Sequence, residues 1–83
     1  MRRHSHDFVD MYDGLVGFGA DRDTDENTVF YYLQKFSDDL LMKKLLKRLS
    51  EDELSEIFNS ITRLLKVHLT DTEYHDLFLK EES

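Results

Sequence analysis

The stretch "SEDELSEIFNSITRLLKVHLT", residues 50–70, carries both the start signal and the periodicity of an amphipathic helix. Ser50 precedes Glu53 by three positions, which is the spacing of a capping box. Glu51, Asp52 and Glu53 then occupy the first turn, where the helix dipole favours negative charge. These signals predict a helix that begins at residue 51.

The same stretch has apolar residues at steps of three and four positions, within an arc of roughly 140° at helical pitch. The arc contains Leu54, Ile57, Phe58, Ile61, Leu64, Leu65 and Leu69. The opposite face contains Glu56, Asn59, Arg63 and Lys66. We therefore expect a helix over residues 51–69 that turns its apolar face inward and its charged face to water.

The C-terminal segment "TDTEYHDLFLKEES" predicts a last, short helix over residues 71–80. Thr70 and Glu73 form a second capping box, and Tyr74, Leu77 and Phe78 give a short apolar stripe. Because Thr70 directly follows the preceding helix, the joint is tight, and an angled helix pair is favoured over a straight continuation.

Three further helices are expected upstream, over residues 7–17, 25–36 and 38–49. The first contains Gly14, ends at Gly17 or Gly19, and would depend on docking for its stability. The last two could form one kinked helix, but we favour a break with Ser37 as N-cap of the second. In that second helix Leu41, Leu45 and Leu49 form the main apolar stripe.

These segments predict an all-α fold, a small irregular bundle of four to five short helices around one shared interior. A chain of 83 residues is expected to form a single domain over 1–83, with residues 1–6 frayed. It has no cysteine, so neither disulfides nor thiolate zinc sites add stability. A chain this small buries only about 60% of its unfolded surface, so the core could be shared with a second copy or a partner.

The net charge of −7 is unevenly distributed, since residues 29–49 carry five basic and two acidic side chains. An acidic chain argues against general affinity for nucleic acid. The exception is a basic helix face. Its simplest interpretation is the water-exposed side of an amphipathic helix. The alternatives are pairing with the acidic helices and contact with phosphates of nucleic acid or a membrane surface. This face consists of Lys43, Lys44, Lys47 and Arg48.

The acidic run "GADRDTDENT", residues 19–28, has half the pattern of a calcium loop. Asp21, Asp23 and Asp25 match its first ligands, but Glu26 stands where the turn needs glycine, and Tyr32 where the loop needs a bidentate glutamate. We favour a solvated loop that leads into a helix, with Asp23 or Thr24 as N-cap.

His68 and His75 flank the joint between the last two predicted helices. No histidine pair has the i, i+4 spacing that presents two imidazoles from one helix face, so no metal site is predicted. We expect His68 to be partly buried and hydrogen-bonded to a carbonyl or carboxylate group. A pH-responsive element at His68 and His75 is the alternative.

Catalysis has little support in the sequence. There is no cysteine nucleophile, no serine in a glycine-rich elbow and no phosphate-binding glycine motif. We therefore expect no enzymatic activity, no cofactor and no small-molecule substrate. No apolar run is long enough to span a bilayer, and no apolar region follows the basic start "MRRHSH", so a cytoplasmic protein is expected.

The aromatic run "FYYLQKF", residues 30–36, is the most suggestive functional feature. Tyr31 and Tyr32 project about 100° and 200° away from Phe30, so a single neighbour cannot bury all three. Either this helix is central, or a tyrosine is available to a partner. The leading hypothesis is a non-enzymatic protein-interaction module that binds a protein partner or self-associates. The alternatives are a nucleic-acid-related regulator, through the face at 43–48 or as an acidic DNA mimic, and a metal- or pH-responsive switch.

Overall fold

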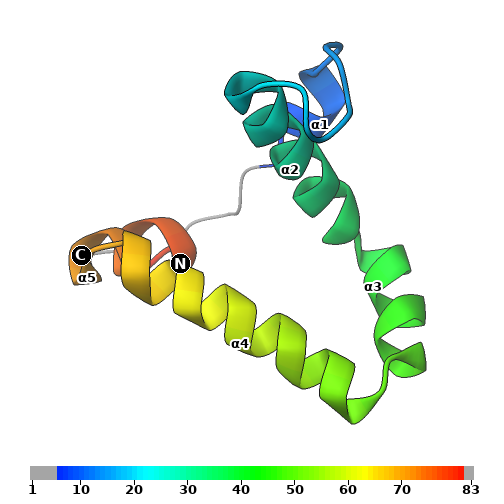
Figure 1. The fold of residues 1–83 in the computed structure, drawn as a ribbon. Coiled ribbons are helices and arrows are strands. Elements are labelled where there is room, and N and C mark those ends of the chain that lie inside the picture. Colours follow the sequence, from blue (N-terminus) through cyan, green and yellow to red (C-terminus); the bar gives the residue numbers. More distant parts are fainter. Residues whose placement is uncertain (1–5, 82–83) are drawn as a thin grey trace. The chain divides into compact units, whose positions relative to one another are not determined.

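The computed structural model describes residues 6–81 and confirms the predicted fold class. The protein is all-α: it is 72% helical, and the described residues contain no strand (Figure 1). The helices are α1 (Phe8–Met11), α2 (Arg22–Phe36), α3 (Asp39–Leu45), α4 (Glu51–His68) and α5 (Asp71–Glu73). A 3-10 turn, η1 (Leu46–Arg48), extends α3, and a π-helical turn, η2 (Tyr74–Phe78), extends α5.

The described chain divides into two compact units, residues 6–47 and residues 48–81. The prediction of a single domain over 1–83 stays a prediction. The segment expected to be frayed, 1–6, lies outside the described residues except for His6. Within residues 6–81, no helix has both the length and the apolar character that a membrane span requires.

In the N-terminal unit, α1 packs against α2 through aromatic rings and one hydrogen bond. The ring of Phe8 stacks on the ring of Phe30, with 4.0 Å between their centroids. The backbone N–H of Val9 donates to Oε1 of Gln34 over 2.8 Å. These contacts explain how a four-residue helix, too short to be stable alone, keeps its place.

The loop between α1 and α2 follows a course that the sequence did not indicate. The prediction of a helix over 7–17 is wrong after residue 11, because the backbone at Tyr12 is already extended. The hydroxyl of Thr28 then holds Gly17 from both sides, accepting from its N–H at 3.0 Å and donating to its carbonyl at 3.3 Å. Gly19 adopts a φ of 102°, a conformation that glycine accepts without strain.

Helix α2 begins at residue 22, one turn earlier than predicted. Asp21, rather than Asp23 or Thr24, is the N-cap, and its carboxylate accepts from the backbone N–H of Thr24 at 2.8 Å. The predicted break after residue 36 is confirmed, but Ser37 is the C-cap of α2. Asp38 caps α3 instead, by accepting from the N–H of Leu41.

In the C-terminal unit, both predicted capping boxes are confirmed. Ser50 and Glu53 exchange hydrogen bonds of 2.8 and 3.1 Å at the start of α4, and Thr70 and Glu73 do so at 2.9 and 3.2 Å at the start of α5. The last helix departs from prediction after residue 73, where a π-helical turn runs to Phe78. Lys80, with a φ of 59°, lies beyond the end of that turn.

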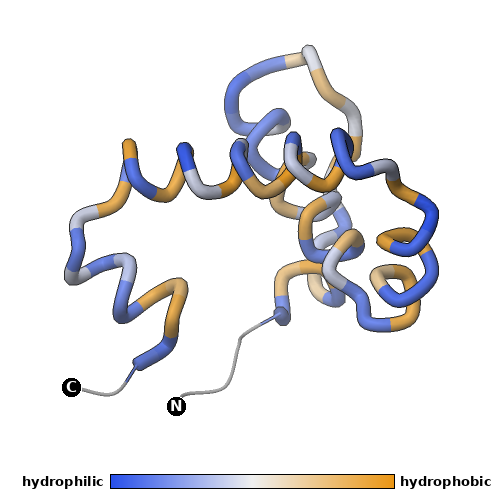
Figure 2. The backbone as a smooth tube through the Cα atoms, turned by 90° about the horizontal axis from the view of Figure 1, so that it is seen from below, coloured by the Kyte–Doolittle hydropathy of each residue, from blue (hydrophilic) through white to orange (hydrophobic). Residues whose placement is uncertain are grey.

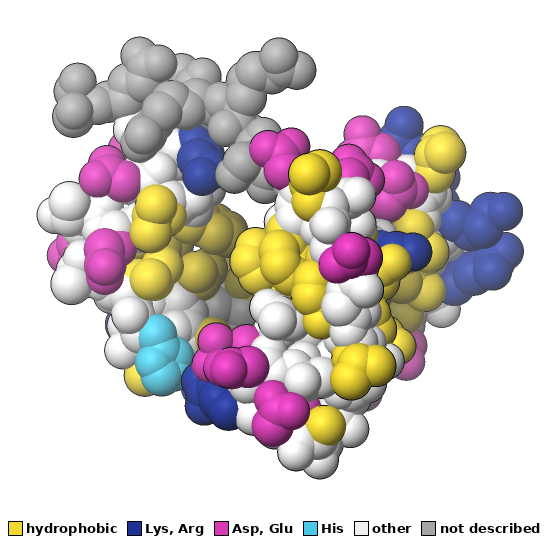
Figure 3. Space-filling view, turned by 90° about the horizontal axis from the view of Figure 1, so that it is seen from above, with side chains coloured by type: hydrophobic (Ala, Val, Ile, Leu, Met, Phe, Trp, Pro, Cys, Tyr) yellow, Lys and Arg dark blue, Asp and Glu magenta, His cyan; other side chains and the backbone are white. Residues whose placement is uncertain are grey.

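Neither unit forms a closed apolar interior from its described residues, and an interior shared between the units stays a prediction. None of their apolar side chains is buried, and the one buried residue is Thr28, at 5% exposure. Hydrophobic side chains therefore lie at the surface (Figure 3). The physical reason is clearest for α4, since the other described helical residues of its unit after α4 are the eight of α5 and η2, and α4 itself has 18. At 1.5 Å per residue, roughly 12 Å of helix cannot cover about 27 Å.

Candidate interaction surfaces

The apolar face of α4 is the first functional candidate. Apolar and polar residues alternate turn by turn along this helix (Figure 2), which gives it the amphipathic character predicted from the sequence. The face is open to solvent, because Phe58 is 69% exposed and Ile61 is 47% exposed. Ile57 and Leu65 are half-buried. The face is therefore partly exposed, and large exposed apolar patches are typical of interaction surfaces.

A groove lies between the C-terminal half of α4 and the α5–η2 segment, with a volume of about 550 Å³. One wall is α4 and the other is formed by Tyr74 and Phe78, whose rings stack at 5.3 Å. Two charged side chains, Lys66 and Asp71, also line it. The lining residues are Phe58, Ile61, Thr62, Leu65, Lys66, Leu69, Asp71, Tyr74 and Phe78. We call this feature the α4 groove.

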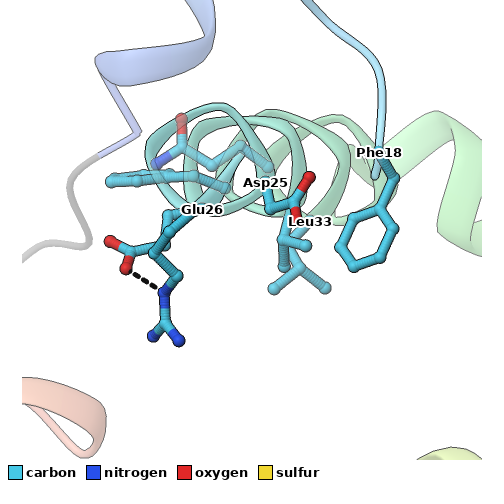
Figure 4. Close-up of a pocket in the computed structure, with 8 residues that line it drawn as sticks. Phe18, Asp25, Glu26 and Leu33 are labelled. Carbon is cyan, nitrogen blue, oxygen red and sulfur yellow. Dashed lines mark hydrogen bonds and ion pairs between the residues drawn. The ribbon is translucent and has the colours of Figure 1, made fainter. Parts of the chain in front are cut away.

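A second, shallower hollow of about 640 Å³ lies over α2 in the N-terminal unit. Figure 4 shows Phe18, from the loop before α2, on the same side of the helix as Leu33. Arg22 and Glu26 form an ion pair at one end, and this contact raises the pKa of Arg22. Asp25 accepts a hydrogen bond from the N–H of Gly19 at 2.7 Å, so its carboxylate holds the loop.

The two tyrosines singled out from the sequence have different surroundings. Tyr31 is half-buried beside Tyr12, and the ammonium of Lys35 lies 5.0 Å from the centroid of its ring. Tyr32 is 63% exposed. Of the two alternatives, the structure places one tyrosine at the surface, while its role as an interaction residue stays a prediction.

The basic face at residues 43–48 is exposed. Pairing of this face with the acidic helices of the C-terminal unit stays a prediction. The residues of this face are Lys43 and Lys44 on α3, and Lys47 and Arg48 on η1.

The acidic run at 21–25 serves local structure. Asp21 caps α2, and the hydrogen bonds from the backbone N–H and hydroxyl of Thr24 lower the pKa of the Asp21 carboxyl group. Asp25 fixes Gly19, as described above. Within residues 6–81, no group of three or more His, Cys, Asp or Glu side chains is placed to hold a metal ion.

The two histidines near the joint do not come together as a site. His68 is exposed, contrary to the expectation of partial burial. No hydrogen bond from its ring is found in the described region, so the expected carbonyl or carboxylate partner is not observed. His75 is also exposed, and its Nδ1 lies 3.0 Å from Oε2 of Glu81.

Sequence reasoning missed two polar residues that help to hold the N-terminal unit together, Thr28 and Gln34. Both are polar residues within a helix, and the residue pattern of the sequence does not distinguish them from polar residues that face water. It also missed the α4 groove as a cavity, although it did identify the apolar residues of both walls.

Comparison with known proteins gives no relative, since no family model, no curated protein and no solved structure matches this chain.

Proposed function

We propose that this chain is a non-enzymatic protein-interaction module, a small cytoplasmic regulator or accessory subunit that binds another polypeptide through α4 and the α4 groove. The observation that carries the proposal is that the chain has amphipathic helices but buries none of their apolar residues within the described part. Burial of apolar surface is the main favourable term in both folding and association. A second polypeptide is the natural source of the missing burial.

The chemistry of the surface also supports a protein partner. The α4 groove is lined mainly by aliphatic and aromatic side chains, and apolar grooves of this kind commonly bind an amphipathic helix. Phe58 of this face is 69% exposed, and large aromatic residues often dominate binding energy.

Site-specific photo-crosslinking in the native cells tests this proposal. A benzophenone amino acid replaces Phe58 in one protein and Asn59 in a second, which places the same probe on the apolar and the opposite face of α4. Polypeptide adducts are expected from position 58 and few from position 59. Equal yields from both positions, or no adducts from position 58, would contradict the proposal.

A further inference from the structure

The two halves of α4 differ in a way that makes the helix complementary to itself. Its C-terminal half forms one wall of the α4 groove, together with α5 and η2. Among the described residues, those of α4 before Phe58 do not line this groove, and Leu54 is exposed there. One end of the unit thus offers an apolar groove, and the other end offers an uncovered amphipathic helix that would fit such a groove.

The charges of α4 follow the same division. The first turn contains Glu51, Asp52 and Glu53, whereas the last turn contains Lys66 and His68. A second α4 helix that runs antiparallel places each acidic first turn beside a basic last turn. A parallel pair would instead bring the two acidic ends together, with like charges opposed.

We propose that the occupant of the α4 groove is a second copy of this chain, paired antiparallel so that the N-terminal half of each α4 enters the groove of the other. The interface is two-fold symmetric and therefore closes as a dimer. This inference rests on the proposed function, because the dimer uses the same face of α4. It goes further by identifying the partner as a second copy of the chain.

The apolar side chains determine the register. When residues whose numbers add to 119 lie opposite each other, Phe58 of one copy meets Ile61 of the other, and Leu54 meets Leu65. In this register Glu51 lies within one turn of Lys66 of the second copy. At 100° per residue, Glu51 and Lys66 lie on the same flank of the helix, and equal flanks face each other in an antiparallel two-fold pair.

The main opposing force is the net charge of −7 on each copy. At physiological salt the Debye length is about 8 Å, so repulsion between distant charges is largely screened, while the local contacts at the helix ends are screened less. Association is therefore expected to strengthen when salt rises from low to physiological concentration.

Sedimentation equilibrium of the full chain at physiological salt tests the proposal, with Phe58→Asp and Asn59→Asp as a matched pair. Both variants add one carboxylate, but only the first adds it to the apolar face. The unmodified chain and Asn59→Asp are expected to be dimers, and Phe58→Asp is expected to lose at least roughly a hundredfold in dimer affinity. A monomeric unmodified chain, a higher oligomer, or equal effects of both variants would overturn the proposal.

A charge exchange provides a second test that leaves the apolar face intact. Lys66→Glu is expected to weaken the dimer about threefold to tenfold, since it opposes Glu51 of the other copy. Adding Glu51→Lys to the same chain is expected to restore part of the loss. Additive losses would overturn the antiparallel arrangement.

The outcomes also separate this inference from the proposed function. If the chain is monomeric and position 58 crosslinks to a different protein, the dimer is contradicted and the proposed interaction function is supported. If the chain is monomeric and position 58 gives no adducts, both the dimer and the proposed interaction function are contradicted.

Discussion

The N-terminal and C-terminal units are held together in different ways. In residues 6–47, side-chain hydrogen bonds join positions far apart in sequence, such as Gln34 to Val9 and Thr28 to Gly17. In residues 48–81, the capping boxes and the contact between His75 and Glu81 join residues three to six positions apart. The first unit therefore has internal tertiary contacts, while the second has well-defined helix ends and an uncovered apolar face.

This difference indicates where the protein depends on something beyond its own chain. Local hydrogen bonds determine where α4 begins, but they do not fix what packs against it. Apolar burial supplies most of the stability of a helix in a protein, and α4 has little of it within its unit. We expect α1 and α2 to keep their packing at any protein concentration, and α4 to gain protection when a partner is present.

The largest expected effect within the N-terminal unit is that of Phe8→Ala. Loss of the ring that stacks on Phe30 should destabilise the unit by about 2 kcal/mol, less than full burial would imply because both rings are partly exposed. Hydrogen exchange at the amide of Val9 is the measurement, since its bond to Gln34 should open. Phe18→Ala, which removes an exposed ring, is the control and should leave this amide protected.

Thr28→Val should have the next largest effect. It keeps the shape of the one buried residue but removes the hydroxyl that holds Gly17, at a cost of about 1–2 kcal/mol. Chemical denaturation gives the change in stability, and exchange of the Gly17 amide locates it. Thr72→Val, at an exposed position, should change neither. An unchanged Gly17 amide in the Thr28 variant would show that the loop is held by other contacts.

Ser50→Ala should cost about 1 kcal/mol of α4 stability, because the capping hydrogen bond to Glu53 is lost. Circular dichroism should show reduced helicity, and the loss should shrink at concentrations where the dimer forms. Ser55→Ala, within the same helix, should change helicity slightly in the opposite direction, because alanine is the better helix former. Equal losses from both variants would argue against the cap.

The smallest effect concerns pH and the cap of α2. Because hydrogen bonds from Thr24 lower the pKa of Asp21 in the folded chain, its ionised form stabilises the fold above the ordinary value of 3.8. That contribution should be lost as pH falls through the lower, folded pKa. Asp21→Asn keeps a cap but does not titrate, so its melting temperature should fall less on acidification than that of the unmodified chain. Parallel curves for the two proteins would contradict this account.

The sequence predicted best those features that depend on neighbours along the chain. Capping boxes and helical periodicity are local, and they placed α4 from Ser50 onward to within one residue. Contacts between distant segments could not be read in this way. The end of α1 depends on the extended backbone at Tyr12 and on a loop held by Thr28, and neither has a sequence signature.

The candidate surface was predicted in part for the same reason. Periodicity identified the apolar face of α4, but it led to the expectation that this face would be buried. Whether a stripe is covered depends on the length of the elements beside it, and here α5 and η2 are too short. The last segment forms a π-helical turn, and local residue propensities could not predict this type of helix.

The most direct test of the account is a spin-label distance measurement across the proposed dimer. The chain has no cysteine, so Asn59→Cys and Asp52→Cys each give a single labelling site on the polar face of α4. In the antiparallel pair, the 1.5 Å rise separates the two residues 59 by about 2 Å along the axes, and the two residues 52 by roughly 22 Å. We expect a clear distance for each variant, longer at position 52 than at position 59. No dipolar signal, or the same distance at both positions, would contradict the account.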